Sequence, residues 1–379
     1  MTKYKLGEIC EIVSGSTPKT GIAEYWGGEL KWITPAEISE DSYIITDSVR
    51  KLTELGIKKT GLTPLPKGTV ILSSRAPIGK VAIAGCEMYC NQGFKNLICT
   101  KKINNRYLYW FLKGNTAYLN SLGRGATFKE ISKQIVSGIE INVPDMNQQM
   151  QAVENLEKVW RIIQLRKQEL QKGDELIKAR FVEMFGDPVY NTNDLPIRNL
   201  NELGSWASGG TPSRTVPEYF KGNIDWYSAG ELNTLFLEGS VEKITEEAIE
   251  KSATKLFKAG SLLIGMYDTA AFKMGILKED SASNQACACI TPNDEVNIIW
   301  LYYELQMMKE HFLSQRRGVR QKNLNLGMIK AFKIPITKRE QQDEFSDFVK
   351  QVDKSKVAIQ AALDKSQLLF DSLMQKYFG

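Results

Sequence analysis

The sequence contains one histidine, His311, among 379 residues. A multi-histidine metal site and the HExxH zinc motif each need at least two histidines, so both are excluded. A histidine-based catalytic triad could exist at one place only, and the first half of the chain has no histidine matching His311. The surrounding residues Lys309–Leu313 are expected to be helical. We therefore interpret His311 as a packed or solvated helix residue.

Long apolar runs are also missing. No stretch approaches the roughly 18 consecutive apolar residues that a membrane helix requires, and Met1–Lys5 lacks the apolar stretch of a secretory signal. We expect a cytoplasmic protein without a membrane partner. Most of the six cysteines stand in apolar, strand-like runs and are expected to be reduced thiols that pack as small hydrophobic residues. A metal site at Cys86 and Cys90 remains an alternative, although partners at a ligand spacing are absent.

Catalytic motifs are incomplete or absent. Ser74–Val81 resembles a phosphate-binding loop, but serine replaces its first glycine and valine replaces the Ser or Thr that would hold magnesium. A hairpin turn is the better interpretation. No GxGxxG motif opens a helix after a strand, and neither the tetrad of amino-methyltransferases nor the acidic-x-Lys pair of a common nuclease core is present. The sequence predicts a chain without catalytic activity, without a bound cofactor and without a metal.

The overall composition is that of an ordinary soluble protein, with 42% apolar and 25% charged residues. A length of 379 residues suits two or more domains. The net charge of +5 permits binding to nucleic acid without requiring it.

The sequence occurs in two copies. Gly15–Pro18 returns as Gly209–Pro212, an offset of 194 positions that falls to 193 later in the chain. Solenoid units have periods of roughly 20–50 residues, so this period indicates a duplicated module. Two copies that keep their skeleton while the rest diverges predict two related tasks on two different targets. The other matched positions are Tyr25 and Tyr219, Gly28 and Gly222, Trp32 and Trp226, Glu37 and Glu231, Asn91-Gln92 and Asn284-Gln285, Arg124-Gly125 and Arg317-Gly318, and Phe185-Gly186 and Phe378-Gly379.

Each copy is predicted to contain a mixed domain of the α+β class, because short apolar runs alternate with turns and with one helical stretch. Expected strands are 5–13, 32–38, 69–72, 80–84, 94–100 and 139–143 in the first copy and 261–266, 272–277, 286–291 and 332–334 in the second, with helices at 104–122 and about 297–313.

A long helix is predicted after each domain. Asn147–Phe185 contains no proline and a single glycine, Gly173, and Glu340–Phe378 follows the same pattern. Apolar residues at alternating spacings of three and four are typical of a coiled-coil seam, and each helix would be about 55–60 Å long. Neither stripe can be buried alone, so we expect an antiparallel pair; two ordinary domain helices are the alternative. The predicted seam residues are Leu156, Trp160, Ile163, Leu170 and Ile177, and Val352, Ile359, Leu369 and Leu373.

Polar loops in both copies carry side chains suited to DNA. Amides can read adenine edges, and basic loops that lead into helices offer charge and backbone N–H groups to phosphates. Recurrence at one offset favours DNA contact over solvated charge, whereas the Asn-Gln pairs are equally consistent with buried amides that hold a turn. The predicted DNA-binding residues are Arg75, Asn91, Gln92, Lys95, Arg124, Thr127, Lys129, Lys133, Arg214, Lys273, Asn284, Gln285, Arg316, Arg317, Arg320, Lys322 and Asn323.

These features together resemble the specificity subunits of type I restriction–modification systems. The resemblance rests on the openings Ser14–Pro18 and Ser208–Pro212, the Asn-Gln pairs, the Arg-Gly loops, the Pro-to-Gln-Gln junctions at 144–149 and 335–342, and the long helices ending in Phe-Gly. It covers essentially the whole chain. The basic loop is much denser in the second copy than in the first, which puts equal anchoring of DNA by the two domains in doubt.

The resemblance implies two target-recognition domains, at 1–145 and 188–336, and two antiparallel spacer helices, at 146–187 and 337–379, in a pseudo-two-fold arrangement. Each domain would read one half of a split, asymmetric site in double-stranded DNA. Two modification subunits that use S-adenosylmethionine and ATP-dependent restriction subunits would be the partners, and those cofactors would bind only there. A coiled-coil protein–protein scaffold without DNA specificity is the alternative function. A module from a single-chain restriction enzyme is disfavoured because catalytic motifs are missing.

Overall fold

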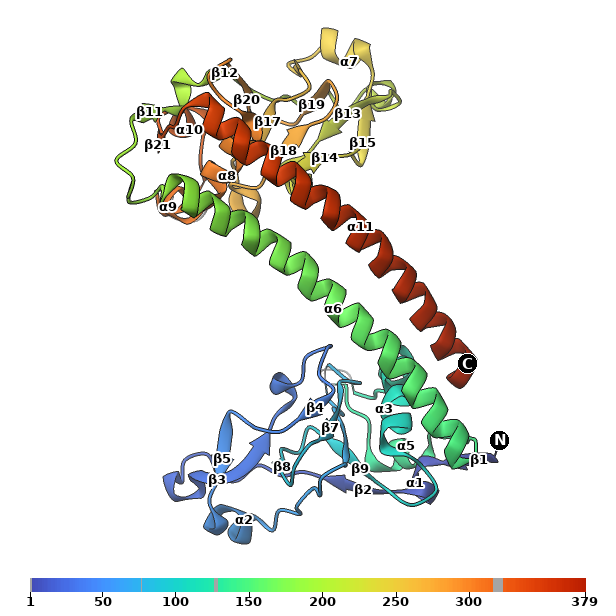
Figure 1. The fold of residues 1–379 in the computed structure, drawn as a ribbon. Coiled ribbons are helices and arrows are strands. Elements are labelled where there is room, and N and C mark those ends of the chain that lie inside the picture. The colour runs from blue at the N-terminus through green and yellow to red at the C-terminus, as the bar shows by residue number, and fades with distance from the viewer. Residues whose placement is uncertain (1, 76, 126–128, 316–322) are drawn as a thin grey trace. The chain divides into compact units, whose positions relative to one another are not determined.

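The structure, a computed structural model, describes residues 2–75, 77–125, 129–315 and 323–379. It has two compact units, Met1–Lys167 with Ala361–Gly379, and Gln168–Gln360. Each unit contains a mixed α/β domain and part of each of two 40-residue helices, α6 (Met146–Phe185) and α11 (Arg339–Phe378) (Figure 1). The predicted fold class, two repeated α/β domains with long helices, is confirmed.

The first domain is built on a five-stranded sheet, a three-stranded sheet and a two-stranded ribbon. In spatial order these are β2 (Cys10–Ser14), β9 (Lys95–Cys99), β6 (Val70–Leu72), β7 (Val81–Ala84) and β4 (Ile44–Ile45); β5 (Arg50–Leu52), β3 (Trp26–Ile33) and β8 (Tyr89–Cys90); and β1 (Thr2–Lys5) with β10 (Glu140–Val143). Its helices are α1 (Leu6–Ile9), α2 (Glu54–Thr60), α3 (Asn105–Gly114), α4 (Thr116–Ser121) and α5 (Lys133–Gly138), with 3-10 turns η1 (Ala23–Tyr25) and η2 (Pro35–Glu37).

The second domain repeats this topology strand for strand and adds one strand to the smaller sheet. Its sheets are β12 (Gly204–Ser208), β20 (Cys287–Pro292), β17 (Leu262–Gly265), β18 (Met274–Leu277) and β14 (Phe236–Leu237); β15 (Glu242–Ile244), β13 (Ile224–Tyr227), β19 (Ser281–Ser283) and the added β16 (Leu256–Phe257); and β11 (Ile197–Asn199) with β21 (Lys333–Pro335). Its helices are α7 (Glu246–Glu250), α8 (Ile298–Met307), α9 (Lys309–Ser314) and α10 (Leu326–Lys330), with 3-10 turns η3 (Leu200–Glu202), η4 (Pro217–Phe220), η5 (Ala229–Glu231) and η6 (Asp268–Ala270).

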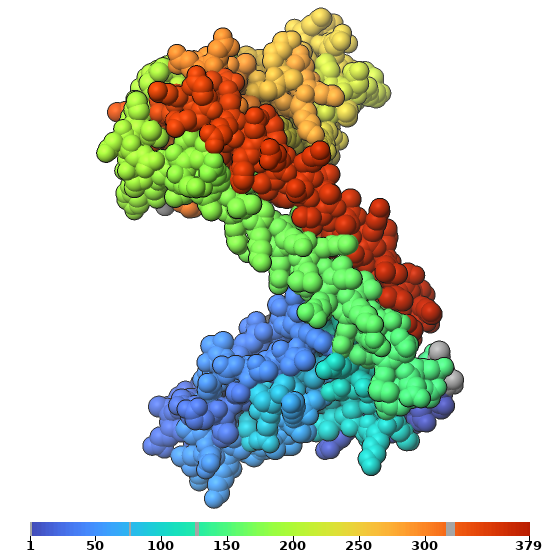
Figure 2. Space-filling view, in the orientation of Figure 1, coloured from blue at the N-terminus to red at the C-terminus, as the bar shows by residue number. Residues whose placement is uncertain are grey.

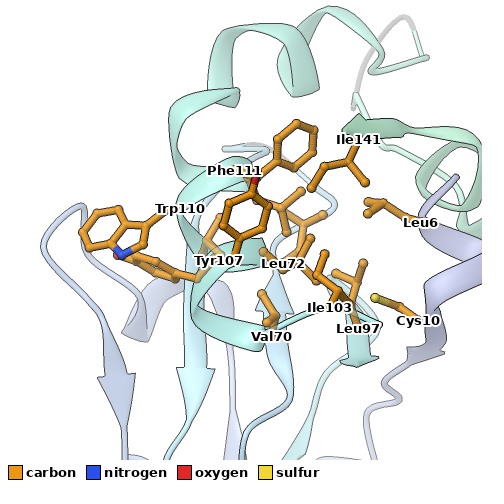
Figure 3. Close-up of a cluster of buried hydrophobic side chains, with 14 of the residues drawn as sticks. Leu6, Cys10, Val70, Leu72, Leu97, Ile103, Tyr107, Trp110, Phe111 and Ile141 are labelled. Atoms are coloured by element: carbon orange, nitrogen blue, oxygen red, sulfur yellow. The ribbon is translucent and has the colours of Figure 1, made fainter. Parts of the chain in front are cut away.

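Helix α3 covers one face of the five-stranded sheet in the first domain. Figure 3 shows Tyr107 and Phe111 from α3 beside Val70 and Leu72 of β6 and Leu97 of β9. All five side chains are buried. This interface removes the apolar face of a short helix from water, and burial of such side chains is the main source of stability for both elements.

Three predicted elements are interrupted in the structure, and one has different ends. The predicted strand 5–13 is interrupted by α1, because β1 pairs with β10 while β2 pairs with β9 in another sheet. Strand β3 starts at Trp26 and ends at Ile33, where Thr34 caps the turn η2. The helix predicted at 104–122 breaks at Asn115, whose side chain donates to the carbonyl of Phe111. The helix predicted at 297–313 breaks at Met308.

The two long helices run antiparallel within each unit. In the first unit, Asn155 Nδ2 of α6 donates to the hydroxyl of Tyr377 of α11 at 2.8 Å, and Arg166 contacts Ser366. In the second unit, Arg180 forms an ion pair with Glu344 at 2.9 Å. As residue numbers rise along α6 they fall along α11. Figure 2 shows the first part of α11 against the second domain, next to the last part of α6.

Most of the predicted seam residues are buried or half-buried. Leu156, Ile163 and Ile177 are buried; Trp160, Leu170, Val352, Ile359 and Leu373 are half-buried. Leu369 is a correction, because its side chain is 52% exposed. Phe370 takes the inward position instead, with its ring centroid 5.5 Å from that of Trp110. Neighbouring residues on a helix point about 100° apart, so Leu369 and Phe370 cannot face the same surface.

A buried glutamine attaches each long helix to its domain. Gln149 accepts a hydrogen bond from Asn104 N at 2.8 Å and donates to the carbonyls of Lys102 and Pro144 at 3.1 and 2.9 Å. In the second unit, Gln342 makes the same three bonds with Asn297, Glu295 and Thr337. The second residue of each Gln-Gln pair therefore connects the helix to the start of α3 or α8.

Candidate nucleic-acid interface

Two of the repeated motifs form one structural unit in each domain. A Cβ atom on Gly15 would lie 2.2 Å from the carbonyl oxygen of Asn91, so only glycine fits there. The hydroxyl of Thr17 donates a hydrogen bond to Gln92 Oε1. The second domain repeats the close approach and the hydrogen bond with Gly209, Asn284, Thr211 and Gln285. The Gly-x-Thr-Pro loop and the Asn-Gln turn are thus held together.

The two amides of each Asn-Gln pair have different roles. Asn91 Oδ1 accepts from the backbone N–H of Gly93 at 2.9 Å, and Asn284 Oδ1 accepts from that of Ala286 at 3.0 Å. Both asparagines therefore hold turns, which is the structural role that the sequence left open. Gln92 and Gln285 are exposed, and the bond from threonine engages only the oxygen of each amide. The donor NH₂ groups point to these glutamines as the better candidates for reading DNA.

An aromatic pair supports the Gly-x-Thr-Pro loop from β3. Trp32 Nε1 donates to the carbonyl of Ser16 at 3.1 Å, and Trp26 Nε1 donates to that of Lys19 at 3.3 Å. The two indoles meet edge to face with centroids 5.0 Å apart. In the second domain, Phe220 and Trp226 form the corresponding pair, and Trp226 Nε1 donates to the carbonyl of Gly210 at 2.9 Å. We refer to each pair as the aromatic platform of its domain.

The repeated glutamates are structural. Glu37 accepts from the N–H groups of Thr34 and Val49, each at 2.8 Å, and so joins the end of β3 to the tip before β5. Glu231 does the same for Ser228 and Val241, at 2.8 and 2.7 Å. These bonds satisfy backbone donors at two loop ends and fix the tips beside the platforms.

Three of the predicted cations in the first domain contact Glu130. Glu130 forms ion pairs with Arg75 at 3.0 Å and with Lys95 at 3.2 Å, and its backbone exchanges hydrogen bonds with Arg124. Partial burial acts to raise the pKa of Glu130, but the hydrogen bonds from Arg75 and Lys95 outweigh it and hold that pKa below its usual range. Lys95 is a correction, because it begins β9 and is buried instead of standing on a loop.

Three of these residues, Lys95, Arg124 and Glu130, border an open hollow of about 840 Å³ on the first domain. Arg124, Lys133 and Tyr118 contribute to its lining together with Lys95 and Glu130. Lys129 and Lys133 are exposed, and Lys133 begins α5. Thr127 lies outside the described residues. The hollow therefore combines basic side chains with an aromatic ring on one surface of the first domain.

Predicted residues of the second domain are distributed differently. Lys273 Nζ lies 3.4 Å from the carbonyl of Gly230, and Asn323 Oδ1 accepts from the N–H of Asp268 at 3.0 Å. The arginine-rich loop is not among the described residues, so the predictions for Arg316, Arg317, Arg320 and Lys322 rest on the sequence.

Arg214 stacks on the second aromatic platform and pairs with Glu242. Its guanidinium carbon lies 4.2 Å from the ring centroid of Phe220 and 5.3 Å from that of Trp226. Both guanidinium nitrogens contact the Glu242 carboxylate, and this hydrogen bond raises the pKa of Arg214 and lowers the pKa of Glu242. The charge of Arg214 is thus already matched within the chain, and its contact with DNA stays a prediction.

Arg50, which is not among the predicted DNA-binding residues, stacks on the first platform. Its guanidinium carbon lies 3.4 Å from the ring centroid of Trp26 and 5.5 Å from that of Trp32. The sequence did contain a signal for this position. Ser48–Thr53 matches Ser240–Thr245 at an offset of 192, and the two segments differ in charge where Arg50 is matched by Glu242.

The described residues offer no evident metal or membrane site. All six cysteines are free, and within the described ranges no group of three or more His, Cys, Asp or Glu side chains could hold an ion. Burial raises the pKa of Cys90 and of Cys287 to about 12, which disfavours the thiolate that a metal or an electrophile would need. None of the helices in the described part of the chain has the length and apolar character needed to span a bilayer.

Comparison with known proteins connects this arrangement to DNA specificity domains. A sequence profile of the family described as type I restriction modification DNA specificity domain matches residues 1–172 and 193–367. The MjaIX specificity subunit of a type I restriction enzyme from Methanocaldococcus jannaschii is 38% identical over 184 residues, which are 48% of this chain and 42% of that protein. The EcoR124I/EcoR124II specificity subunit from Escherichia coli is 24% identical over 170 residues, 43% of this chain and 42% of that protein. The match thus spans less than half of each relative.

Solved structures share the fold over the full chain. The S subunit of a type I restriction–modification system from M. genitalium superposes with a TM-score of 0.63 at 14% identity, covering 100% of this chain and 96% of that one. A chain from a structure of type I system assembly and conformational transition gives a TM-score of 0.60 at 17% identity, with 99% and 97% covered. Because the profile matches both halves, the chain belongs to the type I restriction–modification DNA specificity domain family and contains two copies of that domain.

Proposed function

We propose that this chain is the sequence-specific DNA-recognition subunit of a type I restriction–modification complex. Each domain reads one half of a bipartite, asymmetric site in double-stranded DNA. The observation that carries the proposal is the duplicated unit in which an aromatic platform, a Gly-x-Thr-Pro loop and an exposed glutamine are held in the same way, while the surrounding charged residues differ. A shared scaffold with different surface chemistry suits two readers of different sequences.

The helix pair sets the spacing between the half-sites and docks two methyltransferase subunits, and restriction subunits complete the complex. A rigid connection between two readers makes half-site spacing a geometric property, as it is for dimeric DNA-binding proteins. The chain itself is non-catalytic. S-adenosylmethionine and ATP bind only to the partner subunits.

Sequencing of methylated positions in a host that carries this chain and its modification subunits tests the proposal. We expect one split motif whose two halves differ and whose central spacer is fixed in length. A continuous motif, or the same sequence in both halves, would contradict it. A gel shift on random duplexes with and without the modification subunits separates this function from a protein–protein scaffold, for which no salt-dependent DNA affinity is expected.

A further inference from the structure

Both domains place an arginine on the aromatic platform, but from different positions in the chain. In the first domain Arg50 lies on β5, directly opposite Trp32 in the strand register. In the second domain the position opposite Trp226 holds Glu242. The stacked residue there is Arg214, which precedes β13 and matches Thr20 at the offset of 194. Both domains therefore have an arginine stacked on the platform, but the two arginines stand at different positions of the repeat.

Because the two arginines stand at different positions, the two platforms differ in net charge. Arg214 is neutralised by Glu242, and the neighbouring Lys243 pairs with Asp225 at 2.9 Å. Arg50 is exposed and has no ion pair or side-chain hydrogen bond with any residue that the structure describes. Lys19, whose carbonyl accepts from Trp26, is also an exposed cation, and its counterpart in the second domain is Ser213. The first platform carries unmatched positive charge and the second does not.

Stacking prepares Arg50 to bind a phosphate. The indole of Trp26 fixes the plane of the guanidinium at a centroid distance of 3.4 Å. The N–H donors of a guanidinium lie in that plane, at its edges, so stacking leaves them available. A guanidinium held in one orientation loses less conformational entropy on binding than a free lysine, and its paired donors match the oxygens of a phosphate.

We propose that Arg50 on the Trp26 platform is a DNA phosphate contact that the second domain lacks at the equivalent place. In the sequence, residues 316–322 of the second copy include four basic residues, whereas the matching residues 123–129 of the first include two. The first domain thus compensates through its platform. This inference rests on the proposed function, because it assigns a residue to the same DNA interface.

The test measures binding of the full chain to a random-sequence duplex over a series of salt concentrations. Arg50→Gln removes the charge. Each phosphate contact contributes about 0.9 to the slope of log affinity against log salt. We expect Arg50→Gln to lower that slope by about 0.9 and to weaken binding by about tenfold at moderate salt.

Two double variants separate charge from packing. Thr20→Arg with Arg50→Glu rebuilds the second domain's neutral pair on the first platform and keeps a guanidinium for stacking, and we expect it to bind like Arg50→Gln. Arg214→Gln with Glu242→Gln removes the matched pair from the second platform, and we expect the wild-type slope. Thermal unfolding followed by circular dichroism verifies that each variant is folded.

The results separate the role of Arg50 from the proposed function of the whole chain. A folded Arg50→Gln variant with the wild-type slope, or an equal loss of slope in the Arg214→Gln, Glu242→Gln variant, would overturn the assignment of Arg50 and leave the proposed function standing. A wild-type chain without salt-dependent affinity would overturn the proposed function and this inference together.

Discussion

At the scale of single residues, Glu304 is the clearest difference between the two domain cores. It occupies the position in α8 that Phe111 occupies in α3, since both helices begin after a capping asparagine, Asn297 and Asn104. Its side chain is 1% exposed, and its Oε1 has no hydrogen-bond partner among the described residues. Burial raises the pKa of Glu304 well above its usual range. Burial thus disfavours the ionised form of this carboxyl in the folded domain.

We expect Glu304 to make the stability of the second domain depend on pH. A carboxyl whose pKa is raised by folding binds more protons in the folded state, so the free energy of unfolding falls as pH increases. This contribution is fully present below the unfolded-state pKa of about 4.3 and is lost as pH rises toward the raised folded-state pKa. We expect Glu304→Leu to abolish that fall and to stabilise the domain by about 1–3 kcal/mol near pH 8. Urea unfolding at several pH values measures the free energy of unfolding of both proteins.

Glu304→Gln is the control for charge alone, since it keeps the size and polarity of the side chain but cannot ionise. Its unfolding free energy should lose the pH dependence without the full gain expected for leucine. Equal pH profiles for wild type and both variants would show that Glu304 does not titrate across the measured range.

At the scale of elements, the attachment of each long helix depends on one buried glutamine. Gln149 and Gln342 are 1% and 0% exposed, and each makes three hydrogen bonds to the backbone of its own domain. Their neighbours Gln148 and Gln341 are exposed. Gln149 and Gln342 are therefore structural; Gln148 faces solvent, and Gln341, although exposed, accepts a hydrogen bond from the hydroxyl of Thr337.

We expect Gln149→Ala and Gln342→Ala each to destabilise the chain by about 2–4 kcal/mol, because backbone groups at the start of α3 or α8 lose their partners while buried. Gln148→Ala and Gln341→Ala serve as controls: the first should change the free energy of unfolding by less than about 0.5 kcal/mol, and the second by about 1 kcal/mol or less, because the Thr337 hydroxyl loses its acceptor. Denaturant unfolding of the four variants measures the difference. Equal effects within either pair would refute the structural role.

Helices and strands were the features of this protein that the sequence predicted best. The strands at 69–72, 80–84 and 139–143 and both long helices are confirmed nearly to the residue, because apolar periodicity and turn residues act locally. The hairpin predicted in place of a phosphate loop is confirmed by the antiparallel pairing of β6 with β7. Some differences come from contacts with distant residues, as when β1 and β2 pair in different sheets, whereas the break in the helix predicted at 104–122 occurs at the local hydrogen bond of Asn115.

At the scale of the whole molecule, α6 and α11 each pass from one compact unit to the other, near Lys167 and near Gln360. We expect insertion of seven residues at both points to lengthen the helix pair by about 10 Å without changing its seam, since seven residues restore the 3.5-residue repeat. Under the proposed function, the preferred spacer between half-sites then lengthens by about three base pairs.

Methylation-site sequencing with the double-insertion chain measures the spacer. Inserting seven residues into α6 alone is the control, because it shifts the two seams out of register and should abolish recognition. An unchanged spacer in the double insertion would remove the helix pair as the element that sets the distance.

The sequence by itself determined the duplication, the two long helices and the motifs that join loop to turn. All of these follow from spacing and side-chain type along the chain. Tertiary structure alone decided how charge is distributed: Lys95 is neutralised by Glu130, Arg214 is matched by Glu242, and Arg50 is left unmatched on Trp26. The physical reason is that the effective charge of a side chain depends on its partner and its exposure, and both are set by residues that folding brings together from distant positions.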